Sequence, residues 1–161
     1  MKVFVIYDSK YGNTQIVAEN ILEGLKQSEG VEASIGYAKQ VDSGMLAGFD
    51  VLAFGAPNHM GKPSRTMMKF VDSLSKAPLD AKWVAAFDTY FQRQRYFEKA
   101  MKKLEKHLNT RLPNLKLITS GLSVRVNGVN GPVREGELAK AQEFGKKLAA
   151  QLKAQHSPQS S

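Results

Sequence analysis

Polar residues that can hold an anion stand together at positions 9–14, directly after the apolar run at positions 3–6. They include the hydroxyls of Ser9 and Thr14 and an amide side chain, and Gly12 allows the backbone to approach a ligand closely. An amphipathic stretch follows, so the unpaired N–H groups at the start of a helix would face the same place. This pattern favours a phosphate site, although a capped turn would use similar residues. The candidates are Ser9, Lys10, Tyr11, Gly12, Asn13 and Thr14.

Two further polar segments follow the apolar runs at positions 51–54 and 83–87. In an open parallel sheet, ligands bind beyond the carboxyl ends of the strands, where the strand order reverses. We therefore expect these segments to lie beside the first one. The candidates in the second segment are Pro57, Asn58, His59, Met60, Gly61 and Lys62. Those in the third are Asp88, Thr89, Tyr90 and Phe91.

Two common nucleotide motifs are missing from the sequence. There is no G-x-G-x-x-G, so the usual dinucleotide-binding motif is excluded. Five residues separate Gly55 from Gly61 where a P-loop has four, and Pro63 occupies the position that needs Ser or Thr. The chain is therefore not a Walker-type nucleotide hydrolase.

The elements that would position these segments alternate along the chain between buried strands and amphipathic helices. This alternation implies right-handed crossovers and a parallel sheet covered on both faces. We expect strands at 1–7, 31–37, 51–54, 83–87 and 115–126, and helices at 13–27, from Ser64 to Leu74, from Phe97 to Leu108, and at 135–153. The fold class is thus α/β, a three-layer doubly wound five-stranded parallel sheet. One domain would cover 1–153, and 154–161 would form a polar tail.

Composition narrows the chemistry further. The chain has 161 residues, no cysteine and three histidines, which argues against thiolate zinc sites, iron–sulfur clusters and a metal site in general. No apolar run is long enough to span a bilayer, and we expect a cytoplasmic protein. The net charge is +8, divided as −3 over residues 1–60 and +11 over residues 61–161. A basic half favours acidic proteins, nucleic acid or anionic membranes as partners, or is simply a solvated surface.

The segment at 9–14 resembles the FMN phosphate loop of flavodoxins, S/T-x-T-G-x-T, except that Tyr11 replaces a threonine. Flavodoxin-like NAD(P)H:quinone oxidoreductases also place a tyrosine there. The resemblance covers residues 1–153 and implies FMN as cofactor, the short-chain type, and strand order 2-1-3-4-5. The flavodoxin family is a known instance of binding where the strand order reverses.

The resemblance also gives roles to the other two segments. Met60-Gly61 resembles the residue–glycine peptide that meets N5 of the flavin, in a type II turn where glycine takes positive φ. The Gly55-x-Pro57 opening and the position of Gly61 after it are similar to the quinone oxidoreductases. Tyr90 or Phe91 would stack on the flavin ring, Tyr90 being favoured. Lys62 beside N5 would make the flavin potential less negative than in acidic flavodoxins.

The resemblance implies an FMN-binding carrier that shuttles electrons between redox proteins. The alternative is an NAD(P)H-dependent FMN quinone or flavin oxidoreductase, to which Tyr11 and His59 point. A non-redox binder of anionic ligands is a third possibility. The basic stretch from Arg93 to Arg111 would attract an acidic redox partner, whereas no base-reading module supports nucleic acid.

Overall fold

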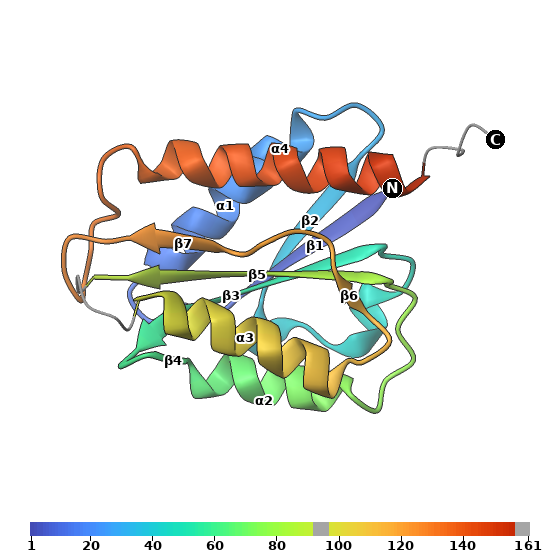
Figure 1. Cartoon of the computed structure of the whole chain (residues 1–161), viewed down its shortest axis with the longest axis horizontal. Coiled ribbons are helices and arrows are strands. Elements are labelled where there is room, and N and C mark those ends of the chain that lie inside the picture. Colours follow the sequence, from blue (N-terminus) through green and yellow to red (C-terminus); the bar gives the residue numbers. More distant parts are fainter. Residues whose placement is uncertain (92–96, 157–161) are drawn as a thin grey trace.

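The computed structural model describes residues 1–91 and 97–156. A parallel sheet forms the middle layer, with α1 and α4 on one face and α2 and α3 on the other (Figure 1). The elements in chain order are β1 Lys2–Tyr7, α1 Asn13–Lys26, β2 Glu32–Tyr37, the 3₁₀ turns η1 Ala38–Gln40 and η2 Ser43–Leu46, β3 Val51–His59, β4 Lys62–Pro63, α2 Arg65–Leu74, β5 Trp83–Tyr90, α3 Phe97–Arg111, β6 Lys116–Leu117, β7 Leu122–Arg125 and α4 Glu137–His156. The three-layer α/β fold is confirmed.

The strand order is β2-β1-β3-β5, with β6 and β7 both pairing with β5, so the predicted order is confirmed. The fifth predicted strand is divided in two. β6 pairs with the start of β5 and β7 with its end. Between them Gly121 lies so close to Met101 that an added Cβ would be 2.3 Å from its sulfur, and the Gly121 N–H donates to the Glu105 carboxylate at 3.1 Å. This close approach to α3 interrupts the ladder.

Two apolar layers hold the sheet between its helices. The layer beneath α1 and α4 includes Val5, Ile21 and Leu148, and the layer beneath α2 and α3 includes Phe54 and Leu104, all fully buried. Alternate residues of each strand enter opposite layers, as the pleat requires. The strands read as continuous apolar runs because both faces are covered.

Several element boundaries differ from the prediction; β5, for example, ends at Tyr90 and not at Phe87. β3 continues past Phe54 to His59, because Ala56 and Pro57 still pair with β5. Gly55 does not end the strand; an added Cβ there would be 2.0 Å from the Phe87 ring, so glycine makes room for that ring. α4 begins at Glu137 instead of Glu135, since Gly136 has a φ of 86°. It also continues to His156, past the predicted end.

The Ser64 cap is confirmed, because its side chain accepts a hydrogen bond from the Met67 N–H at 3.3 Å. Over residues 1–91 and 97–156, no helix is both long and apolar enough to cross a bilayer.

Candidate functional site

A cavity of about 70 Å³ opens at the carboxyl edge of the sheet, where the loops after β1, β3 and β5 meet. β1 has β2 on one side and β3 on the other, so this edge is the place where the strand order reverses. The structure brings eleven of the sixteen predicted site residues into its lining. The full lining is Ser9, Lys10, Tyr11, Asn13, Thr14, Pro57, Asn58, His59, Thr89, Tyr90, Phe91, Val126 and Val129.

The first wall of the cavity is the start of α1. Gly12 occupies the N-cap with a φ of 90°, and no described side chain caps the helix. Ser9 Oγ instead accepts the Gly12 N–H at 2.9 Å, which shapes the preceding turn. The first N–H groups of α1 are thus left for a ligand, beside the buried side chains of Asn13 and Thr14. Such a helix start binds anions through its N–H groups and its dipole.

The second wall comes from β5. Thr14 Oγ1 and Thr89 Oγ1 share a hydrogen bond of 2.9 Å, which fixes the phosphate-loop candidate to the end of β5. Asp88 points to the other face of the strand, where its Oδ2 accepts the Met101 N–H of α3 at 2.9 Å. Asp88 therefore does not line the cavity; it anchors α3. Phe91, 37% exposed, offers an aromatic face at the cavity margin.

The third wall ends in a two-residue hairpin, β3–β4, with Met60 and Gly61 at its tip. Both residues have positive φ, 54° and 83°, so the predicted type II turn is wrong. These values are those of a type I′ turn, which matches the right-handed twist of paired strands. Asn58 Oδ1 accepts the Gly61 N–H at 2.6 Å and holds the turn. Positive φ at Met60, a non-glycine residue that is 94% exposed, costs about 1 kcal/mol or more.

Met60, Gly61 and Lys62 lie outside the cavity lining. Lys62 lines a separate groove on the same hairpin. The hairpin therefore presents Pro57, Asn58 and His59 to the cavity and its tip to solvent. The pairing of His59 with Lys62 joins these two sites.

Two lining residues, Val126 and Val129, belong to a loop that we did not expect at the site. This loop follows β7 and folds back, with Val126 bridged to Val133. Gly131 packs on Asn13, where an added Cβ would be 2.3 Å from Oδ1. The sequence places Val129 between Gly128 and Gly131, a pattern that marks a loop but does not indicate its contact with Asn13.

Tyr90 borders a second, polar cavity of about 320 Å³ at the start of α4. Burial raises the pKa of the Tyr90 hydroxyl above its ordinary value, and the nearby Glu137 carboxylate adds to this. Burial alone would also raise the pKa of Glu137. Its bonds from Lys140 Nζ at 2.6 Å and from the Arg125 N–H at 2.9 Å outweigh burial, so the pKa of Glu137 is lowered. Glu137 thus ties α4 to β7 beside the candidate site.

We expect the Glu137→Gln substitution to reduce the free energy of unfolding at pH 7 by about 1 kcal/mol, because a charge-assisted bond is lost. A carboxyl whose folded pKa is lowered stabilises the fold above its unfolded pKa. That contribution disappears as the pH falls through the folded pKa. Urea unfolding should therefore show a difference in free energy of unfolding between the wild type and the variant that is largest near pH 7 and disappears below about pH 4. A difference that widens in acid would contradict this ion pair.

Within the described residues, no three His, Asp or Glu side chains gather in a way that could hold a metal ion. The site instead presents helix N–H groups, hydroxyls and amides to one end of a ligand and aromatic and apolar side chains to the other. The donor set fits the phosphate of FMN at the uncapped α1 start, and the Tyr90–Phe91–Val129 side fits an aromatic ring.

The fold and site define a class: a doubly wound α/β protein with a helix start that no described side chain caps, beside a cavity at its topological switch point. A flavodoxin domain model matches residues 4–120. The chain belongs to the flavodoxin family, whose cofactor is FMN. A flavodoxin from Clostridium saccharobutylicum is 36% identical over 89 residues, 55% of this chain and 56% of that protein. The chain spans about half the length of the curated relatives it matches.

Solved structures are similar over nearly the whole chain. A flavodoxin from the domain Archaea superposes with a TM-score of 0.79, at 22% identity over 95% of this chain and 99% of that one. A flavodoxin, WrbA-like protein from Agrobacterium tumefaciens gives a TM-score of 0.76, at 23% identity over 97% and 99% of the two chains. At such identities the likeness establishes the fold.

Proposed function

We propose that this protein is an electron carrier that binds FMN in the cavity at the carboxyl edge of the sheet. One observation carries the proposal: α1 begins at a glycine N-cap with positive φ and no side-chain cap, directly against the buried polar side chains of Asn13 and Thr14. A helix start left open in this way, at the switch point of the sheet, is suited to a phosphate.

Each wall of the cavity has a role in this proposal. The hydroxyl groups of Ser9 and Thr14 and the first N–H groups of α1 hold the phosphate end. The Gly12 N–H stays bonded to Ser9 Oγ, and the Thr14–Thr89 bond keeps the loop in place. Tyr90 and Phe91 cover one side of the ring, with stacking worth about 1 kcal/mol beyond burial. Bound FMN supplies the electron chemistry, while the protein positions it and controls access of water.

The FMN model is tested by titrating the apoprotein with FMN and with riboflavin, which has the same ring and no phosphate. Flavin fluorescence reports binding. We expect FMN to bind at least about 100-fold more tightly than riboflavin, because charge-assisted bonds to the phosphate contribute several kcal/mol together. Equal affinities would contradict a phosphate site at α1, and no FMN binding at micromolar concentration would contradict the cofactor assignment.

The second half of the experiment separates a carrier from an enzyme. The FMN complex is mixed with NADPH alone, without air, and flavin absorbance is followed. We expect no bleaching within minutes for a carrier, because a carrier receives electrons from a reductase. Rapid bleaching would establish the alternative, an NAD(P)H-dependent FMN oxidoreductase, in which His59 at the cavity would face the substrate.

A further inference from the structure

A groove of about 340 Å³ lies where the β3–β4 hairpin, the start of α2 and the side of α3 meet. Its lining residues are Lys62, Pro63, Arg65, Met68 and Lys103, and we call these five residues the basic groove. Pro63 is buried and Met68 half-buried, whereas the three cations are exposed. The groove is therefore an apolar floor within a rim of positive charge.

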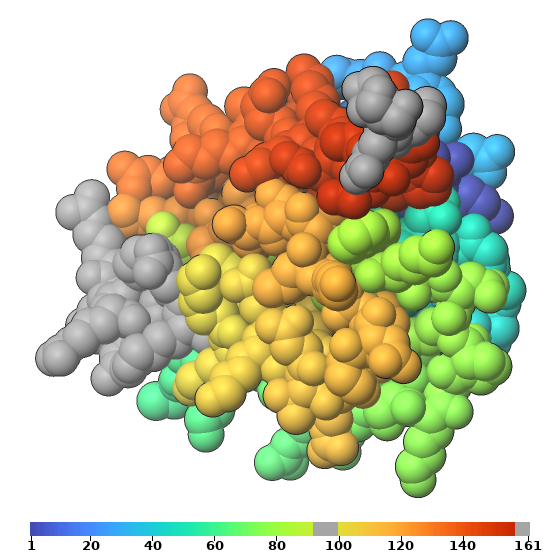
Figure 2. Space-filling view, turned by 45° about the vertical axis from the view of Figure 1, so that its right-hand side comes forward, coloured from blue at the N-terminus to red at the C-terminus, as the bar shows by residue number. Residues whose placement is uncertain are grey.

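The surface around the basic groove adds to its charge. Lys69 on α2 and Lys106 on α3 are also exposed. Neither they nor the three rim cations form an ion pair with any side chain described at positions 1–91 or 100–156. Figure 2 shows α3, in yellow, open along this side of the molecule beside the orange segment that carries β6. An unneutralised field of this size attracts acidic surfaces over about 10 Å in moderate salt.

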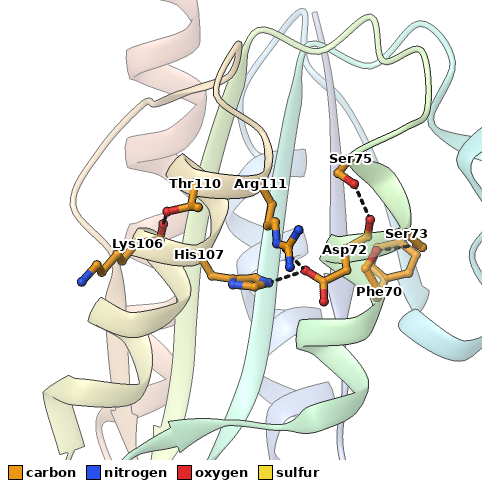
Figure 3. Close-up of polar contacts among 8 residues, drawn as sticks. All are labelled: Phe70, Asp72, Ser73, Ser75, Lys106, His107, Thr110 and Arg111. Atoms are coloured by element: carbon orange, nitrogen blue, oxygen red, sulfur yellow. Dashed lines mark hydrogen bonds and ion pairs between the residues drawn. The ribbon is translucent and has the colours of Figure 1, made fainter.

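The two acidic side chains that the structure describes on α2 and α3 do not neutralise this rim, because both are engaged elsewhere. Asp72 Oδ1 accepts from His107 Nε2 at 2.8 Å and from Arg111 Nε at 3.0 Å (Figure 3). Glu105 is buried; its Oε2 accepts from the Gly121 N–H and its Oε1 lies 3.5 Å from Lys102 Nζ. The positive charge of the groove is therefore available to a partner.

One short element, the β3–β4 hairpin, connects the basic groove to the FMN cavity. Lys62 of the rim pairs across the hairpin with His59, which lines the cavity. The tip residue between them, Met60, is 94% exposed and apolar. A protein seated in the groove would thus cover the hairpin and come close to the flavin ring side of the cavity.

We propose that the basic groove is the docking surface for an acidic redox protein, which sets carboxylates against Lys62, Arg65 and Lys103 and an apolar side chain on Pro63 and Met68. The inference rests on the proposed function, since it takes the docked protein to exchange electrons with FMN. Apolar contact inside a charged rim is the usual anatomy of a protein interface. A nucleic acid is disfavoured because the lining has no aromatic side chain on which a base could stack.

The test compares two triple variants with equal changes of charge. The groove variant carries Lys62→Glu, Arg65→Glu and Lys103→Glu. The control variant carries Lys26→Glu, Lys116→Glu and Lys147→Glu, three exposed lysines outside the groove. A third variant with Gln at the groove positions is used if the Glu variant fails to fold. FMN affinity is measured first for each, so that failure of the cofactor site is seen separately from failure of docking.

Electron transfer is then followed by stopped flow, from the chemically reduced holoprotein to acidic cytochrome b5 or basic cytochrome c. At about 0.01 M ionic strength we expect the groove variant to react at least about tenfold more slowly with cytochrome b5, because steering is lost. The rate of the control variant should fall by no more than about threefold, because only the long-range field of the protein changes. Met68→Gln, which leaves the charge unchanged, should lower the rate to a similar extent at low and high salt.

Three outcomes would overturn the docking surface. If both triple variants lose the same fraction of the electron-transfer rate, the effect comes from total charge and not from the groove. If neither variant changes the rate, surface charge does not contribute to docking. A groove variant that loses affinity for a single-stranded oligonucleotide at about 0.15 M salt, with unchanged electron transfer, would assign the groove to nucleic acid. Unaltered FMN binding in every case would leave the carrier function intact.

Discussion

Replacement of Gly12 by valine is expected to weaken FMN binding by at least about 100-fold, equivalent to about 2.7 kcal/mol. Gly12 has a φ of 90°, a left-handed conformation that a β-branched residue adopts only with strain. The chain would relax toward negative φ and turn the first N–H groups of α1 away from the phosphate. No atom lies within 4 Å of an added Cβ, so the effect would come from the backbone and not from a clash.

Gly12→Asn is the matched control, because asparagine tolerates the left-handed region far better than valine. We expect its FMN affinity to remain within about tenfold of the wild-type value. Riboflavin affinity should change little in either variant, since riboflavin makes no phosphate contact. Fluorescence titrations of both ligands check this. Equal weakening of FMN and riboflavin by valine would mean that the cavity as a whole had collapsed, and an unaffected valine variant would contradict the role of the α1 start.

The sequence predicted the parallel sheet, because burial on both faces leaves continuous apolar runs that alternate with amphipathic helices. The order of the strands followed from the resemblance to flavodoxins and not from these runs. It also predicted which loops meet, since the carboxyl ends of β1, β3 and β5 must share one edge. Eleven predicted residues accordingly line one cavity. Asp88 shows the limit of this argument: its position on β5 was right, but the pleat sends its side chain to α3.

The errors have a common physical origin in contacts between distant residues. Gly55 appeared to end a strand, yet the Phe87 ring occupies the space that its missing side chain leaves. The type II turn expected at Met60-Gly61 follows the resemblance and needs positive φ at Gly61 only, while the twist of the paired strands selects positive φ at both positions. Val129 became a lining residue only because its loop folds back against Asn13 through Gly131. None of these contacts has a local signature in the sequence.

The largest effect on stability is expected at the crossing of α1 and α4, where Gly145 packs directly on the backbone of α1. An added Cβ would be 2.1 Å from the Ile21 carbonyl oxygen and 2.9 Å from the Leu25 nitrogen. In an exposed helix, Gly→Ala would stabilise by about 1 kcal/mol through propensity. Here the neighbours are backbone atoms that cannot rotate away, so the two helices must separate and lose packing across the core.

We therefore expect Gly145→Ala to lower the free energy of unfolding by about 3 kcal/mol, at the upper end of overpacking costs. Urea unfolding of the apoprotein gives this value without a contribution from bound cofactor. Lys147→Ala, on the exposed side of the same helix, should change it by less than about 0.5 kcal/mol. A more stable Gly145→Ala protein would show that helix propensity dominates and that α1 and α4 are not in close contact.

Gly24→Ala tests the same crossing from the other helix, because its added Cβ would be 2.0 Å from the Gln142 carbonyl oxygen. The two substitutions should not be additive. Once either methyl group has forced α1 and α4 apart, the second enters a gap that already exists. The double variant should therefore lose clearly less stability than the sum of the single losses. Full additivity would mean that each glycine affects only its own helix. The two glycines would then not act together at the close crossing of α1 and α4.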